Sequence, residues 1–549
     1  MRRRGRRESA VGLLLGGLVL GALGLGSAGA RPGPAPIRVD QIGYRPGDVK
    51  LALVAGAPAS FAVRDPATGR AVFEGRARPP GPPDPASGDR VAALDFSALT
   101  TPGEYVVAAP GFADSPRFRI GPTVYANPLR AVLKSFTYHR CGTAIRDGSP
   151  FARPACHLGD AGEWGSAGGR RDVTGGWHDA GDYGKYVPAA GITLWHLAAI
   201  PGLTSAPDLL DEMRWELDWL LRMQRADGGV HHKVGPAKWT GDRAPHEDHD
   251  PRYLFAVSSA ATANLAAATA RAARLYRPHD PAYAARLVGA AEAAWRWLTQ
   301  HPAIVPPGGF RNPSGAEGGA YEDDDDRDER FWAAVELWRT TGDARFRAPV
   351  LAGLDQWPPF DYPASWQRVQ NLALLTLLES PSPLEPAARA RLVGALAERA
   401  GWMADALNKG GYRVALTSRD YYWGSNAVAL GRAVQLLAAL RETGRPAFRD
   451  AALDQLHYVF GRNTLGRSFV TGLGAEPPQR PYHQPAIAHP TRLVVPGMLV
   501  GGPNAQAEGV NASFPAHAYE DKDRLYGVNE PAIYWTAVLA YVLAHFAGS

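Results

Sequence analysis

The sequence predicts a mainly α-helical protein in which a small β-sandwich precedes a larger helical domain. Residues 37–121 consist of short β-prone segments separated by clusters of Pro, Gly and Asp, a pattern typical of small β-sandwiches. From about residue 122 onward, long segments repeat apolar residues at helical spacing. A chain of 549 residues is long enough for two or three domains and a large core.

The sandwich prediction depends on segments that are too short for helices and rich in β-branched or aromatic residues. None of them combines a nucleophile, a base and an acid, so we expect this domain to support the protein and not to catalyse. The segments are IRVDQIGY (37–44), KLALVA (50–55), ASFAVRD (59–65), AVFEGRA (71–77), VAALDF (91–96), GEYVVAA (103–109) and PRFRIG (116–121).

The helical prediction depends on nine periodic segments, many with Ala-rich stripes that allow helices to pack closely. Together with long Gly/Pro/Asp loops, they fit a closed ring of helical hairpins. A solenoid is the competing architecture, although the sequence shows no fixed repeat period. The segments are 208–224, 258–276, 284–300, 329–342, 370–380, 388–408, 425–444, 448–463 and 530–546.

The first thirty residues have the composition of a secretory signal peptide. Five arginines precede an apolar run from Val11 to about Leu25, and the small residues 27–30 end in an A-x-A cleavage pattern. Arg6-Arg7 allows twin-arginine export. Residues 31–36, RPGPAP, are predicted to be a linker. We therefore expect an exported protein, either periplasmic or secreted.

The net charge and the composition indicate which classes of molecule the protein could bind. Residues 1–30 hold five arginines and one glutamate, so they account for four of the five net positive charges. The remaining chain is close to neutral and has no basic run, which argues against nucleic acid or anionic membranes as partners. A polysaccharide is compatible, because the 15 Trp and 20 Tyr could supply stacking faces.

The segment DVTGGWHDAGDYGKYV (172–187) carries the clearest chemical signal. Asp179 and Asp182 are three residues apart and are flanked by Gly181 and the Gly175–Gly176 pair. Glycine tolerates backbone angles that other residues avoid, so the loop can present both carboxylates to one small volume. Such a pair could hold and deprotonate a water molecule, which is hydrolase chemistry. The alternative is an ordinary turn with solvated acids.

The only two cysteines, Cys141 and Cys156, allow two interpretations. In an exported protein a disulfide is the default. However, His157 follows Cys156 directly and His178 lies in the acidic loop. Two thiolates and two imidazoles would make a complete tetrahedral set for structural zinc.

Glu530 lies between Asn529 and Pro531 at the predicted start of the last helix. Proline is favoured in the first turn of a helix, and an acid is stabilised near its N-terminus. A helix-capping role is therefore the alternative to a catalytic one for Glu530.

Taken together, these segments resemble glycoside hydrolase family 9, the inverting β-glucanases. The motifs that carry the resemblance are DVTGGWHDAGDYGKYV, residues 213–224, GRNTLGRSFVTG (461–472), VGGPN (500–504) and NEPAIYW (529–535). VDQIGY and DFSALTTPGEYVV (95–107) resemble the immunoglobulin-like domain that precedes the catalytic domain in many members.

The resemblance implies an (α/α)6 barrel over residues 122–549, preceded by an immunoglobulin-like sandwich over 37–121. It implies that Asp182 is the general base, that Asp179 helps to hold the water, and that Glu530 is the general acid. An inverting glycosidase needs these base and acid carboxyls about 6.5–9.5 Å apart. The pKa of Glu530 should be raised by a shielded site, whereas Asp182 should stay ionised.

The resemblance also implies metals but no organic cofactor. Cys141, Cys156, His157 and His178 match a structural zinc site, which would have no open position for catalysis. The acidic run EDDDDRDE (322–329) resembles a calcium loop, with Asp325, Asp328 and Glu329 as the expected ligands. A solvated acidic loop is the alternative for this run.

One departure from the family pattern concerns the substrate. Where the family commonly has His-His-Arg, this chain has Tyr482-His483-Gln484, so a fixed cationic fork is absent. We expect His483 and Gln484 to contact sugar, together with three stacking candidates that could instead be core residues: Trp423, Tyr526 and Trp535. Thr536 also stands where asparagine is frequent.

The favoured function is hydrolysis of β-1,4-glucosidic bonds in cellulose or related β-glucans by a monomeric endo-acting enzyme. An exo-acting β-glucosidase or β-glucosaminidase on oligosaccharides would use the same acids. A non-catalytic glycan-binding protein is the alternative of another class, but the retained Asp179, Asp182 and Glu530 argue against it.

Overall fold

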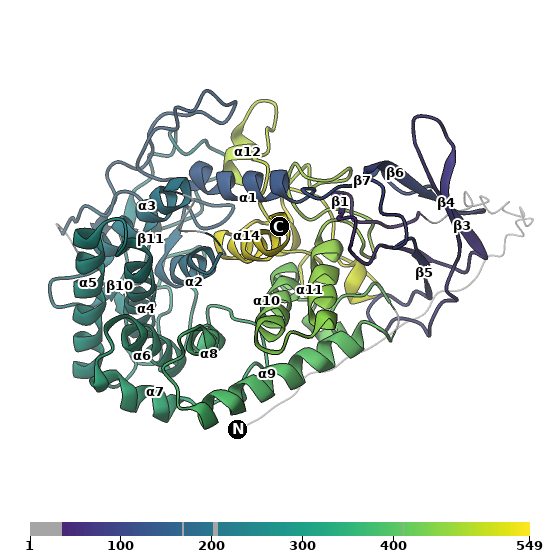
Figure 1. Cartoon of the computed structure of the whole chain (residues 1–549). Coiled ribbons are helices and arrows are strands. Elements are labelled where there is room, and N and C mark those ends of the chain that lie inside the picture. The colour runs from purple at the N-terminus through teal and green to yellow at the C-terminus, as the bar shows by residue number, and fades with distance from the viewer. Residues whose placement is uncertain (1–35, 167–168, 201, 203–206, 410, 549) are drawn as a thin grey trace, which may run out of the picture.

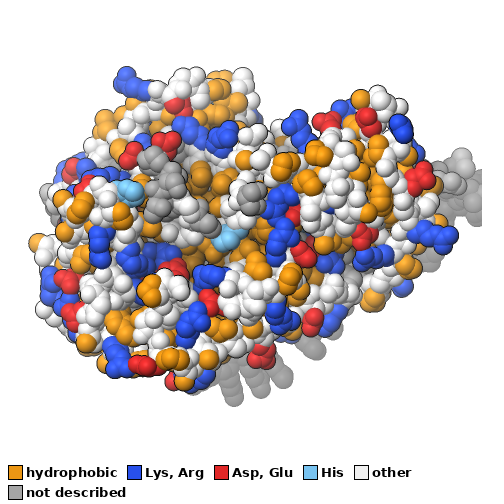
Figure 2. All heavy atoms as spheres, viewed as in Figure 1, with side chains coloured by type: hydrophobic (Ala, Val, Ile, Leu, Met, Phe, Trp, Pro, Cys, Tyr) orange, Lys and Arg blue, Asp and Glu red, His pale blue; other side chains and the backbone are white. Residues whose placement is uncertain are grey.

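The computed structural model describes residues 36–166, 169–200, 202, 207–409 and 411–548. The predicted signal peptide and all but the last residue of the predicted linker lie outside this part. Within it, no helix is both long enough and apolar enough to cross a membrane. On the face shown in Figure 2, Lys and Arg side chains are interspersed with Asp and Glu, so this face carries no large area of one charge.

The N-terminal strands form two sheets at one end of the molecule, beside the helices (Figure 1). One sheet has the order β1-β7-β6-β3-β4, and β2 pairs with β5 in the other. Each of the seven predicted segments contains one strand. The bounds are β1 Gly43–Tyr44, β2 Leu51–Ala55, β3 Ser60–Arg64, β4 Ala71–Arg76, β5 Val91–Asp95, β6 Gly103–Ala108 and β7 Phe118–Ile120.

The two sheets enclose their own apolar core. Tyr44 lies at its centre, with edge-to-face contacts to Phe96 and Phe118 at ring-centroid distances of 5.3 and 5.4 Å. Alternate residues of β3, such as Phe61 and Val63, are buried between exposed or half-buried neighbours. This period of two is what half-buried strands require, so the alternation confirms the predicted sandwich.

The helical part is built around six largely buried helices that lie inside the others (Figure 1). Helix α2 packs against α4 and α14, α4 against α6, α6 against α8, and α10 against α14, while α9 contacts both α8 and α10. The inner helices are α2 Val187–Ala198, α4 Ser259–Tyr276, α6 Arg327–Thr341, α8 Gln370–Leu378, α10 Ser425–Thr443 and α14 Ile533–Ala547.

Most of the surrounding helices bury one face and keep polar residues outward, as expected for amphipathic helices. In α9, for example, Leu392, Leu396, Ala400 and Met403 are the buried residues, whereas in α11 every residue from 451 to 459 is buried. These helices are α1 Ala126–His139, α3 Pro207–Met223, α5 Pro281–Gln300, α7 Arg347–Gly353, α9 Pro386–Ala406 and α11 Pro446–Val459, with the short α12 Gln484–Ala488 and α13 Tyr526–Asn529 in later loops.

Short strands between the first helices position the acidic loop. A four-stranded sheet has the order β8-β12-β11-β9, and β10 pairs with β13. Strand β9 follows the DAGD sequence directly and leads into α2, so this sheet holds the loop at one end of the helices. The strands are β8 Gly162–Glu163, β9 Lys185–Tyr186, β10 Val230–His231, β11 Lys233–Pro236, β12 Arg252–Leu254 and β13 Val257–Ser258.

Candidate active site

The DAGD loop is buried and anchored at both ends by backbone hydrogen bonds. The Asp179 N–H donates to Gly184 O at 2.9 Å, and the Ile533 N–H of α14 donates to Asp179 O at 2.8 Å. A Cβ on Gly181 would lie 2.0 Å from Tyr482 O, and one on Gly176, whose φ is +74°, would lie 2.6 Å from the Trp219 ring. Glycine is therefore required at both positions.

Glu530 approaches this loop from the far end of the chain. The Gly181 N–H donates to Glu530 Oε1 at 3.2 Å, and the Gly501 N–H donates to Glu530 O at 2.9 Å. The predicted helix start at Glu530 is wrong, because α14 begins at Ile533 and Glu530 terminates the short α13. Glu530 thus does not cap α14, and its carboxyl is directed at the loop that carries Asp179 and Asp182.

Burial raises the pKa of all three carboxyls, but their surroundings differ. Burial, with the negative charge of Asp182, raises the pKa of Asp179 to about 8. Burial, with the charges of Asp182 and Asp179, raises the pKa of Glu530 well above its usual value. For Asp182 the rise in pKa due to burial is opposed by the Gly184 amide, Lys233 and Arg252. The pKa of both carboxyls is therefore raised, but cations oppose the rise at Asp182, whereas at Glu530 the opposing group is the neutral Gly181 amide.

Tyr321 is a site residue that the sequence did not reveal. Its hydroxyl donates to Asp179 Oδ2, while Asp179 Oδ1 is buried without a hydrogen-bond partner. The Tyr321 ring packs against Tyr186, at 4.7 Å between ring centroids, and against Trp366 at 5.4 Å. Tyr321 therefore orients one oxygen of Asp179 and leaves the other free for a small polar ligand such as water.

Arg252, which lies near Asp182, and Lys185 share one buried carboxylate, that of Asp160. Arg252 Nε binds Asp160 Oδ1 at 2.6 Å, and Lys185 Nζ binds Asp160 Oδ2 at 2.8 Å. Lys185 also donates to the carbonyls of Val173 and Gly175 in the acidic loop. Because a buried charge is costly unless it is paired, this network keeps its cations in place beside the loop.

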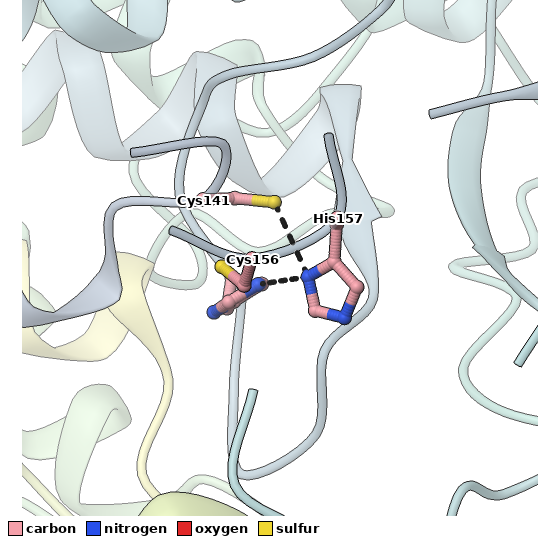
Figure 3. Close-up of side chains that lie close together, drawn as sticks. Cys141, Cys156 and His157 are labelled. Atoms are coloured by element: carbon pink, nitrogen blue, oxygen red, sulfur yellow. Dashed lines mark hydrogen bonds between the residues drawn. The ribbon is translucent and has the colours of Figure 1, made fainter. Parts of the chain in front are cut away.

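The four predicted metal ligands come together at one point. The ligand atoms of Cys141, Cys156, His157 and His178 all lie within 4.8 Å of one another, and both thiols are free, so the structure contains no disulfide between them. The distance from Cys141 Sγ to His157 Nδ1 is 3.5 Å, and that from His178 Nε2 to His157 Nδ1 is 3.2 Å. Figure 3 shows Cys141 beside Cys156 and His157, which are consecutive residues of another segment.

The contacts around this cluster fit a metal site. The second ring nitrogen of His157, Nε2, lies 3.2 Å from Asp248 Oδ2, the carboxylate partner that metal-bound histidines usually have. Two thiols and two imidazoles are the donor set of a closed tetrahedral zinc site. The cluster could hold a structural metal next to the acidic loop, since His178 immediately precedes Asp179.

The acidic run 322–329 differs in part from the predicted calcium loop. Asp328 and Glu329, in the first turn of α6, are buried near Asp323, and burial raises the pKa of all three. Asp325 instead accepts a hydrogen bond from Arg327 Nε at 2.7 Å and is 40% exposed. The structure therefore groups Asp323, and not Asp325, with the other two acids.

The expected sugar contacts fall into two groups. Trp423 and Tyr526 are exposed, with ring centroids 5.6 Å apart, so both are available to stack on a sugar. His483, Gln484 and Trp535 are at most 5% exposed. Burial lowers the pKa of His483 to about 3, so its ring is neutral, and Gln484 Oε1 accepts a hydrogen bond from Thr240 at 3.3 Å.

A pocket lies beside the exposed aromatic residues. Its wall includes Tyr362, Trp366, Trp423, Tyr534 and Trp535. Aromatic walls with a few polar groups are typical of ligand sites. Trp535 therefore lines this pocket although little of its side chain is exposed.

Comparison with known proteins identifies the family. The model of glycosyl hydrolase family 9 matches residues 125–543. The chain belongs to glycosyl hydrolase family 9. The model described as a cellulase N-terminal Ig-like domain matches residues 33–113. These two matches confirm the resemblance found in the motifs, and family 9 membership makes the protein a glycoside hydrolase of the cellulase type.

Individual relatives of this family 9 chain span nearly its full length. Endoglucanase D of Acetivibrio thermocellus is 34% identical over 93% of this chain and 83% of its own. A cellodextrinase of Butyrivibrio fibrisolvens is 30% identical over 92% of this chain and 99% of its own. A metagenome-derived family 9 endoglucanase of known structure is 37% identical, with a TM-score of 0.88 over 94% of this chain and 99% of its own.

Proposed function

We propose that the protein hydrolyses β-1,4-glucosidic bonds in cellulose or related β-glucans with inversion at the anomeric carbon. The contact that carries the proposal is the hydrogen bond from Gly181 N–H to Glu530 Oε1. It brings an acid from residue 530 next to the loop that bears Asp179 and Asp182. The names of the endoglucanase and cellodextrinase relatives support this class of substrate.

In the proposed reaction, each carboxyl has a separate task. Asp182 accepts a proton from a water molecule, which attacks the anomeric carbon from the face opposite the leaving group. Glu530 donates its proton to the glycosidic oxygen as the bond between carbon and oxygen breaks. Asp179, oriented by Tyr321, accepts a hydrogen bond from the same water. The raised pKa of Glu530 supports its role as the acid.

The proposal includes an (α/α)6 barrel as the scaffold. Six inner helices alternate along the chain with other helices that lie outside them (Figure 1). The contacts from α8 through α6, α4, α2 and α14 to α10, with α9 joining α10 to α8, support a closed ring. We place the barrel over residues 122–549 and the supporting Ig-like domain over residues 37–121.

We also propose a structural zinc ion bound by Cys141, Cys156, His157 and His178. The mutual approach of these ligand atoms supports it, and one family 9 structure is described as a Zn-binding triple mutant of an endoglucanase. Calcium near Asp328 and Glu329 remains a second proposal, with Asp323 in place of Asp325. We further propose that residues 1–30 direct export of the protein and that the exported protein is a monomer.

Two substitutions test the catalytic assignment. Asp182→Ala removes the base and Glu530→Gln removes the proton donor without changing side-chain size. Each is expected to lower kcat on barley glucan at least about a thousandfold, with an unchanged circular dichroism spectrum. The exposed Glu476→Gln is the matched control. Near-normal activity in either active-site variant would contradict the assignment, and oligosaccharide binding without turnover by the wild type would favour a non-catalytic binding protein.

The mode of cleavage is tested by product size. We expect internal cutting, which lowers the viscosity of carboxymethyl cellulose before reducing ends accumulate. Monosaccharide release without loss of viscosity would instead show the exo-acting alternative, and preference for chitosan oligomers would show a glucosaminidase. One relative is named a cellodextrinase, so cello-oligomers belong in the same assay.

A further inference from the structure

Two loops that are far apart in sequence meet beside the proposed catalytic acids. Arg524, in the segment 519–526, forms an ion pair with Asp242, in the segment 237–250. The Arg524 side chain is 65% exposed and that of Asp242 is 38% exposed. An exposed ion pair of this kind contributes little to folding stability, so substitutions that break it should leave the fold intact.

Tyr482 shows where the pair lies relative to the acids. The Tyr482 carbonyl lies against Gly181 of the acidic loop, and the Tyr482 N–H donates to Asn529 O at 3.0 Å, next to Glu530. Burial raises the pKa of the Tyr482 hydroxyl, Glu530, Asp182 and Asp242 raise it further, and Arg524 lowers it. The Tyr482 hydroxyl is therefore close enough to interact electrostatically with Glu530 and Asp182 and with both members of the Arg524–Asp242 pair.

The loop of Asp242 is fixed to the walls of the site. Thr240 Oγ1 donates to Gln484 Oε1 at 3.3 Å, and the Tyr183 hydroxyl donates to Arg243 O at 2.5 Å. Further along the same loop, Asp248 contacts His157 of the proposed metal cluster at 3.2 Å. Asp242 therefore belongs to an anchored wall and offers Arg524 a defined partner.

The loop of Arg524 is anchored in the same way. Asp521 Oδ1 accepts a hydrogen bond from Asn529 Nδ2 at 2.9 Å, and Asp523 accepts one from Arg480 at 3.2 Å. Two residues after Arg524 is the exposed Tyr526, whose ring lies 5.9 Å from that of Tyr482. The Arg524 guanidinium pairs with Asp242 while most of its side chain stays exposed, and two residues further along the chain begins an aromatic surface that runs from Tyr526 to Trp423.

We propose that Arg524, held by Asp242, is a specificity-determining residue that binds hydroxyl groups of a substrate sugar next to the catalytic acids. The inference rests on the proposed hydrolysis of β-glucans. Arginine presents five N–H donors in a planar fork, and one carboxylate partner leaves several of them free. Sugar hydroxyls accept such hydrogen bonds, while Tyr526 supplies an apolar face. Gln484 is buried against Thr240 and is less able to serve as an open donor.

The test compares binding with turnover on cello-oligosaccharides of two to five units. Arg524→Ala is expected to raise KM about tenfold, the effect of losing one charge-assisted hydrogen bond, with kcat changed less than about threefold. Arg524→Lys keeps the charge but loses the fork, so its KM should lie between those of the wild type and Arg524→Ala. Asp242→Asn should raise KM less than Arg524→Ala does. Arg391→Ala, which breaks the exposed pair with Asp355, is the matched control and should leave KM unchanged.

Binding without turnover separates this inference from the proposed reaction. In the Glu530→Gln background, titration calorimetry with cellotetraose should show about tenfold weaker binding after Arg524→Ala. Equal affinity with and without Arg524, or an equal effect of Arg391→Ala, would overturn the role of Arg524. If the wild type binds cellotetraose but does not cleave it, the proposed reaction fails while the binding role of Arg524 is still measured.

Discussion

Glu530 and Asp182 differ mainly in which charges lie near them. Glu530 is buried and lies near the negative charges of Asp182 and Asp179, and both effects raise its pKa well above the usual value. Asp182 has Lys233 and Arg252 nearby, which oppose the same effect. Environments that separate two carboxyl pKa values are how a site assigns acid and base roles. This difference leads to a prediction about pH.

Activity should persist to a pH at which an ordinary glutamate has lost its proton. The proposed reaction requires the acid form of Glu530, so on the alkaline side kcat/KM should be lost as the pH rises through the folded pKa of Glu530. We expect the alkaline limb to have its midpoint well above 4.5, the usual value for glutamate. Asp179→Asn removes a neighbouring negative charge and should move this midpoint to lower pH, whereas the exposed Glu476→Gln should not. The measurement is kcat/KM on cellotetraose across pH 4–10, and a wild-type midpoint near 4.5 would contradict the assignment.

The sequence predicted the site residues that belong to compact motifs and missed those that do not. Asp179 and Asp182 were identifiable because glycines and acids are concentrated in one short segment. Tyr321 approaches from a loop, and Lys233 and Arg252 approach from strands β11 and β12. Nothing in their local sequence distinguishes them from ordinary surface or core residues. The sequence also could not show which aromatic side chains are exposed. Trp423 and Trp535 have similar local sequences, but only Trp423 is exposed in the structure.

At the level of elements, all nine predicted helical segments contain helices, but α1, α2 and α7 were not predicted. All twelve residues of α2 are buried, and a helix that is apolar on every side shows little periodicity. Burial alone does not decide this, because all nine residues of α8 are also buried and α8 was predicted, whereas α1 has one buried face and was missed. The short strands β8 to β13 were missed because two to four residues are too few to show alternation.

The proposed zinc cluster joins three segments: Cys141 just after α1, the loop at Cys156 and His157, and the acidic loop at His178. Metal binding to such a site stabilises only the folded state. Removing zinc with a chelator should therefore lower the unfolding temperature by roughly 5 °C and reduce activity, because Asp179 adjoins His178. Calorimetry with measurement of zinc per chain checks this.

Substitution of a ligand should reproduce the effect of the chelator. Cys156→Ser is expected to lose bound zinc and to become insensitive to chelation, while the neighbouring Thr143→Ala should bind zinc as the wild type does. Zinc-free wild-type protein with an unchanged unfolding temperature would refute a structural role for the metal.

At the scale of the whole molecule, a buried carboxylate joins the two domains. Asp40 of the sandwich is fully buried and contacts His457 Nδ1 of α11 at 2.7 Å and the Tyr125 hydroxyl at 3.1 Å. It also accepts backbone hydrogen bonds from Ile42 and Gly43 at 2.8 and 3.1 Å. Four polar groups thus converge on one carboxyl, and His457 is more than four hundred positions from Asp40 in the sequence.

The sandwich should accordingly contribute to the stability of the helical domain that carries the acids. Asp40→Ala leaves these polar groups buried without their partner, which should lower the free energy of unfolding by at least about 1–3 kcal/mol, and the temperature at which activity is lost should fall with it. Glu74→Ala, on the exposed side of β4, should change stability by less than about 0.5 kcal/mol. Thermal unfolding followed by circular dichroism, in parallel with residual activity, compares the two variants. If Asp40→Ala unfolds the sandwich at a lower temperature while activity is lost at the wild-type temperature, the sandwich does not stabilise the helical domain, because the two domains then unfold independently.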